Sequence, residues 1–127
     1  MTNFKQLRIW LKGMEIAKDC YRFVETFPRN EKLALAQQVT RSAVSIPSNI
    51  AEGSGRSSPK EYARFIEIAF GSSFELETQI LIAGSIGIGN TELKNLILKN
   101  INEEQKMLRS FMIKLKEKVN LPGPSRS

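Results

Sequence analysis

Basic side chains are the residues of this chain whose type and spacing best suit a chemical role, the binding of phosphate groups. Lys5, Arg8 and Lys12 are spaced by three and four residues, so a helix would present them on one face. From residue 106 onward, six basic residues stand against Glu117 alone. Such a cluster can neutralise several phosphates and makes binding strongly salt-dependent. We therefore predict these nucleic-acid-binding residues: Lys5, Arg8, Lys12, Lys106, Arg109, Lys114, Lys116 and Lys118.

A solvated polar face, which many amphipathic helices carry, explains the same basic residues equally well. The sequence contains no aromatic platform of the RNA-recognition type and no GXXG loop. Any binding would therefore be to the backbone or the shape of a nucleic acid rather than to its base sequence. The formal net charge of +6 favours a polyanionic partner such as RNA or DNA, although solubility alone also accounts for it.

Residues suited to catalysis or metal binding are scarce. The chain has no histidine, which removes the commonest general base and metal ligand. Its single cysteine, Cys20, rules out a paired-cysteine zinc site and suits a buried position on a helix. Glu67, Glu75, Glu77 and Glu104 could supply carboxylates, but helical spacing does not focus all four on one point. We predict no enzymatic activity, no catalytic residue, no metal and no cofactor.

Four helices must position these residues, because apolar side chains recur every three or four positions through nearly the whole chain. The predicted helices span about 5–26, 31–52, 59–86 and 91–119. Short connections between them predict an all-α, up-down-up-down antiparallel four-helix bundle. We expect one domain over 1–121 and a disordered tail over 122–127. A cytoplasmic location is the default, since no apolar stretch is long enough to span a membrane.

Several local features follow from the helix pattern. Pro47 lies inside the second helix, where it removes one backbone hydrogen bond. We expect Gly53 to close that helix in a left-handed conformation, and Ser58 with Glu61 to cap the third. Glu104 interrupts the apolar stripe of the fourth helix, so it should reach a partner or the edge of the bundle. The apolar stripe of the first helix consists of Leu7, Trp10, Met14, Ala17, Tyr21 and Val24.

A row of small polar residues runs along the second helix beside its apolar stripe. A short antiparallel connection would place Ser45 level with Glu67, and Arg41 between Glu67 and Glu75. We therefore predict that Arg41 pairs with one of these carboxylates, which would fix the register of the two helices. In the alternative interpretation, Ser48, Asn49 and Glu52 form a binding surface. The predicted structural polar network consists of Arg41, Ser45, Asn49, Glu52, Glu67 and Glu75.

Several segments together resemble one known family. They are Phe4-Lys5-Gln6-Leu7 with Trp10, Phe27-Pro28 with Glu31, Leu35, Gln38 and Arg41, then Ser45-Ile46-Pro47-Ser48-Asn49-Ile50-Ala51-Glu52-Gly53, Phe65 with Ala69, and Gly71-Ser72-Ser73 before Glu75-Leu76-Glu77-Thr78-Gln79. This pattern, over about residues 4–115, resembles the four-helix-bundle proteins encoded within 23S rRNA intervening sequences.

The resemblance implies a four-helix bundle that assembles into a homopentameric ring and has no established enzymatic activity. A related accessory protein of diversity-generating retroelements shares the bundle and the ring, and works with a reverse transcriptase and RNA. A subunit of such a ring must bury two faces, one against each neighbour. This requirement would explain why small and polar residues lie beside each apolar stripe.

The residues and the resemblance together lead to two main expectations for function. The first is a non-catalytic, ring-forming bundle that binds RNA or another nucleic acid through its basic surface. The second is a protein-interaction scaffold, or an accessory subunit for a nucleic-acid enzyme such as a reverse transcriptase. Its partner would lie near Ser48, Asn49 and Glu52 or on the ring surface. Neither expectation involves a membrane. A third, a small enzyme with a carboxylate-bound metal, would require metal in the purified protein.

Overall fold

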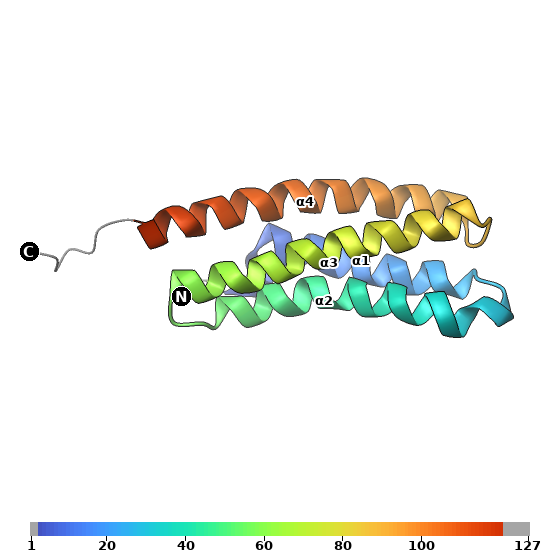
Figure 1. Cartoon of the computed structure of the whole chain (residues 1–127), viewed down its shortest axis with the longest axis horizontal. Coiled ribbons are helices and arrows are strands. Elements are labelled where there is room, and N and C mark those ends of the chain that lie inside the picture. Colours follow the sequence, from blue (N-terminus) through green and yellow to red (C-terminus); the bar gives the residue numbers. More distant parts are fainter. Residues whose placement is uncertain (1–2, 121–127) are drawn as a thin grey trace, which may run out of the picture.

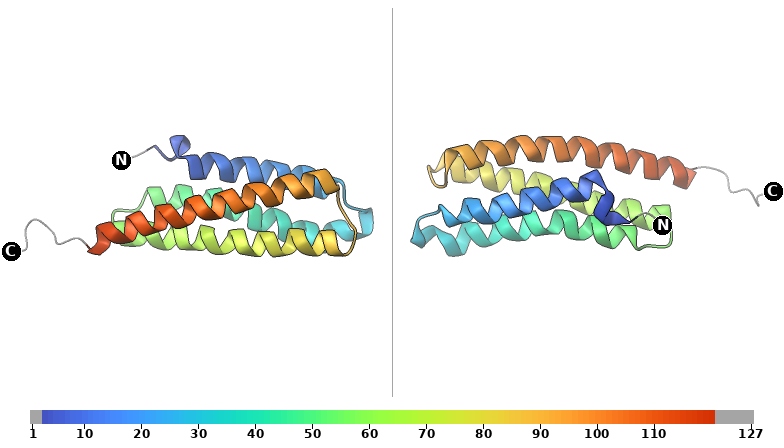
Figure 2. Two further views of the ribbon diagram at one scale, coloured as in Figure 1. Left: turned by 90° about the horizontal axis from the view of Figure 1, so that it is seen from above. Right: turned by 180° about the vertical axis from the view of Figure 1, so that it is seen from behind.

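Four long helices form this computed structural model, which describes residues 3–120 except for the side chains of 31–33. They are α1 (Arg8–Glu25), α2 (Gln37–Ser54), α3 (Pro59–Ser85) and α4 (Thr91–Asn120). Each helix runs opposite to the one before it, and α4 packs against both α3 and α1 (Figures 1 and 2). The predicted all-α class with four helices is confirmed, and no strand occurs among the described residues. The predicted tail, 122–127, lies outside them.

The start of α1 differs from the prediction. Leu7 has an extended backbone (φ −72°, ψ 131°), so α1 begins at Arg8 rather than near residue 5. The preceding residues form a separate 3-10 turn, η1 (Phe4–Gln6), whose N-terminus is capped by the Asn3 side chain. The Phe4 ring contacts the Trp10 ring edge-on at a centroid distance of 5.4 Å, which holds this turn against α1.

The start of α2 also comes later than residue 31. A 3-10 turn, η2 (Arg29–Glu31), and a π-helical turn, η3 (Lys32–Ala36), precede the regular helix, which begins at Gln37. Both turns keep the chain helical but wind it more tightly or more loosely than an α-helix does. Pro47 lies inside α2 and is buried.

The connections around α3 follow from residues with distinct local roles. Ser58 caps α3 as predicted, because its Oγ accepts a hydrogen bond from the Glu61 backbone N–H at 3.2 Å. Gly87 and Gly89 form the turn to α4 with φ of 76° and 86°, a conformation that other residues rarely adopt. A Cβ at Gly89 would also lie 2.5 Å from the Phe23 ring, so only glycine fits there.

The prediction for Gly53 was wrong. α2 continues to Ser54, and Gly55 at its C-cap has φ −89°, so no left-handed residue closes the helix. Gly53 instead lets α2 and α3 approach closely. A Cβ at this position would lie 2.8 Å from Phe65 Cβ and 2.9 Å from Tyr62 Cδ1.

The core lies between all four helices. Along α2, α3 and α4, buried side chains recur every three or four residues, as the apolar periodicity predicts. On α1 the prediction holds in part, because Ala17 and Val24 of its stripe are buried whereas Tyr21 is 54% exposed. The most deeply buried side chains of α1 lie on the neighbouring stripe, which follows the same spacing of three and four. That stripe consists of Ile9, Gly13, Ile16, Cys20 and Phe23.

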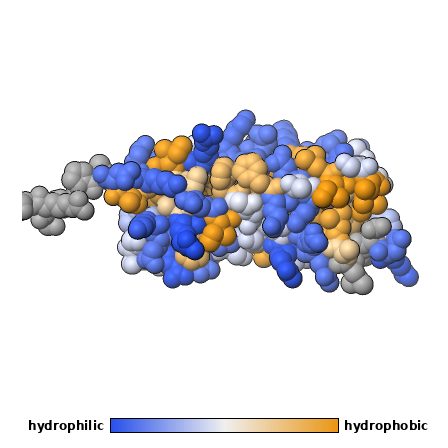
Figure 3. All heavy atoms as spheres, viewed as in Figure 1, coloured by the Kyte–Doolittle hydropathy of each residue, from blue (hydrophilic) through white to orange (hydrophobic). Residues whose placement is uncertain are grey.

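Apolar side chains also remain on the surface. In the view of Figure 3 they gather toward the end of the bundle that carries the α3–α4 turn. Ile82, Ile86 and Leu96 lie in this part of the chain and are exposed. A second apolar surface is a groove of about 340 Å³ between α1 and α2. It is lined by Trp10, Met14, Ala17, Lys18, Tyr21, Val44, Pro47, Ser48 and Ala51.

Candidate nucleic-acid interface

Three parts of the chain meet at one end of the bundle, which we call the terminal end. They are the start of α1, the α2–α3 connection at residues 55–58, and the last turns of α4 (Figures 1 and 2). Because α1 starts at this end and α4 finishes there, the two basic runs of the sequence come together. This is the arrangement expected if α1 and α4 are neighbours, which they are.

A groove between α1 and α4 brings together three of the predicted basic residues. Arg8 comes from the first turn of α1, and Lys106 and Lys114 come from α4, two helical turns apart. All three side chains are exposed. The groove has a volume of about 480 Å³. We call it the α1–α4 groove, and its other lining residues are Leu7, Ile9, Met107, Ser110 and Phe111.

Among the described residues, no carboxylate lines the α1–α4 groove. The groove therefore combines cations on both sides with an apolar floor, which Leu7, Met107 and Phe111 provide. Its three cations form no ion pair with a described residue, so their side chains can meet an external anion, although the Glu103 carboxylate acts electrostatically on Lys106. This geometry suits a ligand that carries negative charge on one part and apolar surface on another.

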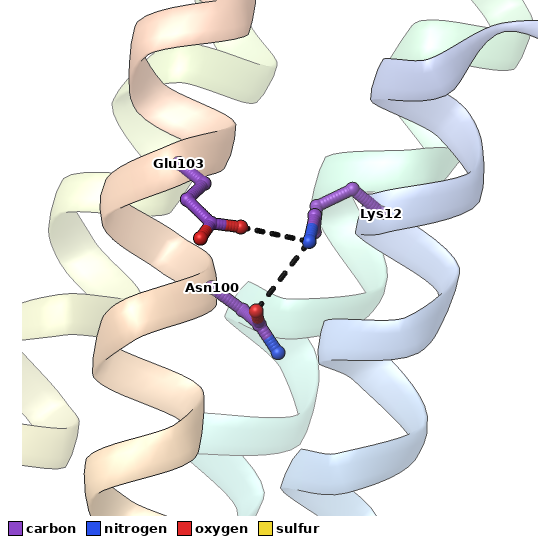
Figure 4. A network of polar contacts seen from close by, with 3 residues as sticks. All are labelled: Lys12, Asn100 and Glu103. Atoms are coloured by element: carbon purple, nitrogen blue, oxygen red, sulfur yellow. Dashed lines mark hydrogen bonds and ion pairs between the residues drawn. The ribbon is translucent and has the colours of Figure 1, made fainter.

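Lys12, one turn further along α1, has a different role from the one predicted. Its Nζ donates to Glu103 Oε2 at 2.9 Å and to Asn100 Oδ1 at 3.4 Å, so it links α1 to α4 (Figure 4). The hydrogen bond raises the pKa of Lys12 and lowers the pKa of Glu103. The carboxylate neutralises this lysine locally, so Lys12 is a poor contact for phosphate.

The remaining predicted basic residues lie apart from the groove. Lys116 pairs with Glu67 on α3 at 3.0 Å. Arg109 follows Gln105 by one helical turn, and Gln105 donates to Glu77 of α3, so Arg109 lies on the α3 side of α4. Lys5 is exposed on η1. The eight residues therefore form no single patch.

A second groove at the terminal end contains a cation that the sequence analysis missed. Arg56 lies in the α2–α3 connection, where it pairs with Glu52 at 2.7 Å and stacks on the Phe65 ring. With Lys118 it lines a groove of about 360 Å³. This groove shares Leu7 and Phe111 with the α1–α4 groove and is otherwise lined by Ser54, Ser57, Ser58, Pro59, Tyr62 and Leu115. The position of Arg56 in a polar connection at this end was the signal that could have revealed it.

The predicted polar network between α2 and α3 exists only in part. Ser45 and Ser72 share a hydrogen bond of 2.8 Å, and the Asn49 side chain donates to Ser45. Ser42 donates to Glu75 at 2.8 Å. Ser45 thus faces a residue more than one helical turn further along α3 than predicted. The offset arises because Gly53 packs inside the first turns of α3 rather than level with its start.

The prediction that Arg41 forms an ion pair with Glu67 or Glu75 was wrong. Arg41 is exposed and has no ion pair with a described residue. Glu67 pairs with Lys116 instead, and Glu75 accepts the hydrogen bond from Ser42. With the observed register, Ser42 rather than Arg41 points at the α3 carboxylate. Glu52 contacts Arg56, outside the network.

Glu104 also differs from its prediction, because it reaches neither a partner nor the edge of the bundle. Its side chain is fully buried, and neither carboxylate oxygen has a hydrogen-bond partner among the described residues. Burial raises the pKa of this carboxyl group to about 8. Gly13 of α1 faces it so closely that a Cβ there would lie 3.2 Å from Glu104 Oε2. Glu104 is therefore a neutral core residue at pH 7.

The structure also shows where the cysteine lies, and whether a metal-binding cluster or a membrane-spanning helix is present among the described residues. Cys20 is buried as predicted, and burial raises the pKa of its thiol to about 12, so it stays protonated. Across residues 3–120, no cluster of three or more cysteine and acidic side chains could hold a metal ion. Within the same part of the chain, no helix has the length and apolar character needed to cross a bilayer.

Comparison with known proteins decides the family. The family model described as 23S rRNA-intervening sequence protein matches residues 5–110, most of the chain. This chain belongs to that family. The part that matches the 23S rRNA-intervening sequence model includes Arg8 and Lys106 of the α1–α4 groove and ends before Lys114.

A solved structure agrees with this fold. It is the crystal structure of a protein of unknown function from the S23 ribosomal protein family of Bacteroides thetaiotaomicron, with a TM-score of 0.76. The two chains are 21% identical over 82% of this chain and 97% of that one. At this identity the likeness shows the fold alone. None of the curated proteins compared with the chain matches it.

Proposed function

We propose that this member of the 23S rRNA-intervening sequence family is a non-catalytic, ring-forming bundle that binds nucleic acid, RNA in the first instance, in the cytoplasm. The observation that carries the binding proposal is the α1–α4 groove. There Arg8, Lys106 and Lys114 gather from opposite ends of the chain, and no carboxylate of residues 3–120 is part of the lining. The formal net charge of +6 adds a general attraction for polyanions.

Binding through these three cations has a definite physical signature. Each phosphate that a cation neutralises releases condensed counterions, so affinity falls as salt rises. Three contacts correspond to a slope of log affinity against log salt of roughly −2 to −3. The contacts reach phosphate rather than base edges, so we expect little preference for base sequence.

A charge-reversal triple variant tests this proposal. We expect Arg8→Glu/Lys106→Glu/Lys114→Glu to weaken RNA binding at least tenfold at low salt and to flatten the salt slope. None of the three residues forms an ion pair with a described residue, so the fold should survive. The measurement is fluorescence anisotropy with a labelled RNA at several salt concentrations, with circular dichroism to check the fold.

The matched control reverses three exposed cations away from the terminal end. Arg29→Glu/Arg41→Glu/Lys99→Glu removes the same formal charge, so it separates the groove from a general loss of attraction. Equal losses in both triple variants would show that net charge alone drives binding. No loss in either variant would contradict the proposal.

Assembly into a ring is the second part of the proposal. A ring requires two different surfaces on each subunit, each buried against one neighbour. The apolar α1–α2 groove and the exposed apolar residues near the α3–α4 turn are the two surfaces that we propose for these contacts. The number of five subunits rests on the family resemblance. Light scattering on the purified protein tests assembly, and a monomer at all concentrations would contradict it.

A protein client is the alternative function, and the α1–α2 groove is the observation that favours it. Ser48, which the sequence analysis named as part of a binding surface, lines this apolar groove. The groove could hold a helix of a nucleic-acid enzyme such as a reverse transcriptase. Co-purification of one defined protein without RNA at moderate salt would favour this alternative.

A further inference from the structure

The two grooves of the terminal end adjoin each other. Leu7 and Phe111 line both the α1–α4 groove and the groove that Lys118 and Arg56 line. The two grooves therefore share apolar side chains, and each has cations in its lining. A purely electrostatic phosphate site would not need such a floor.

A duplex and an unpaired strand would contact the apolar floor of the groove differently. In a duplex the base faces are stacked inside, so the protein meets phosphates and sugars. In an unpaired strand the base faces are free to pack against apolar and aromatic side chains while the phosphates meet cations. Leu7, Met107 and Phe111 line the same groove as Arg8 of α1 and the two lysines of α4.

We infer that the α1–α4 groove takes an unpaired nucleic-acid strand, with phosphates on Arg8, Lys106 and Lys114 and bases against Leu7, Met107 and Phe111. This inference rests on the proposed function and specifies the form of nucleic acid. An unpaired strand matches both the cations and the apolar floor of the groove, because its phosphates are negatively charged and its base faces are large, flat and apolar. The adjoining groove offers Lys118 for a further phosphate of the strand.

The test compares a labelled single strand of about 20 nucleotides with a duplex of the same sequence, using the full chain. We expect the single strand to bind about tenfold more tightly than the duplex at the same salt, since only the single strand has free base faces to pack against the apolar floor. Failure of both to bind would sink the proposed function itself. Equal binding of both would overturn only the present inference.

An uncharged double variant isolates the floor. Leu7→Ser/Met107→Gln removes apolar surface without changing charge. Leu7 is the N-cap residue of α1, where serine is favoured, and glutamine is a good helix former. We expect about tenfold weaker binding of the single strand and unchanged binding of the duplex. The control, Leu11→Ser/Ile113→Gln, introduces the same two polar residues at exposed apolar positions outside the groove and should bind like the wild type.

Two further measurements keep the inference testable if the double variant does not fold. Photocrosslinking of wild-type protein to a 4-thiouridine strand should label peptides that contain residues 4–9 and 104–114. Crosslinks confined to other helices would overturn the inference. Displacement of the strand by poly-glutamate at equal charge would also overturn it, because that result would show that any acidic polymer fits.

Discussion

Glu104 places an ionisable group in the middle of an apolar core. No described residue donates a hydrogen bond to either carboxylate oxygen, and the side chain is fully buried. Ionisation there would leave a charge without water or a close partner, so the neutral form is favoured and the pKa rises to about 8. Lys12 is near enough to oppose this shift, but it is held by Glu103 and Asn100 instead.

The raised pKa predicts that the protein becomes less stable as pH rises. The unfolded chain loses the Glu104 proton near pH 4.5, while the folded chain keeps it up to about pH 8. Between these values the unfolded state binds fewer protons, so the free energy of unfolding falls by up to about 1.4 kcal/mol per pH unit. We expect Glu104→Gln, which stays neutral, to remove this part of the slope. Urea unfolding at pH 5, 6, 7 and 8 measures the effect.

An exposed glutamate away from Lys12 supplies the control for this measurement. Glu117 is exposed and forms no ion pair with a described residue, whereas loss of the Glu103 carboxylate would free Lys12 to act on Glu104. Glu117→Gln should therefore leave the pH slope of the wild type between pH 5 and 8 unchanged. Parallel pH curves for the wild type and Glu104→Gln would contradict the interpretation of Glu104 as a neutral core residue.

At the scale of elements, two glycines inside helices have opposite surroundings. Gly53 lies near the end of α2, where a Cβ would lie under 3 Å from both Phe65 and Tyr62 of α3. Gly71 lies in the middle of α3, and a Cβ there would have nothing within 4 Å. Glycine costs a helix about 1 kcal/mol relative to alanine, so the tertiary contact decides the sign of each substitution.

We expect Gly53→Ala to destabilise the protein and Gly71→Ala to stabilise it. The first change forces α3 away from α2, and overpacking of this kind costs typically 1–3 kcal/mol. The second should raise the free energy of unfolding by roughly 0.5–1 kcal/mol through helix propensity alone. Thermal unfolding of both variants measures the difference, and a stabilised Gly53→Ala variant would contradict the close approach.

The helices themselves could be predicted from the sequence, but their exact packing could not. Apolar periodicity located four helices, since three-four spacing extends over many turns. It located the buried face of α1 only in part, because two apolar stripes lie side by side there and only the other helices decide which one is buried more deeply. The register of α2 against α3 depends on the contacts of Gly53 with Tyr62 and Phe65, which spacing alone does not contain.

For the whole molecule, the predicted gathering of basic residues holds for one group of three. Arg8, Lys106 and Lys114 meet because the helix directions bring the two ends of the chain together. Lys12 and Lys116 are bound by Glu103 and Glu67. These pairs could not be predicted, because each joins helices whose relative rotation is set by core packing.

A substitution in the α1–α2 groove tests whether this groove is a contact between subunits. Val44 lines this groove and is exposed, so Val44→Glu should leave the fold intact while it opposes burial of the groove. We expect the variant to shift toward the monomer in light scattering. Ile113→Glu, on the outer face of α4, is the matched control and should assemble like the wild type. Assembly of Val44→Glu at wild-type strength would place the subunit contacts elsewhere.

The position of the α1–α4 groove has a practical consequence. Arg8 and the last turns of α4 lie beside this groove, so a label attached to either segment would sit next to it (Figures 1 and 2). An acidic label there would then compete with the ligand that it is meant to report. The α3–α4 turn lies at the opposite end of the bundle, which makes it the better place for a reporter group.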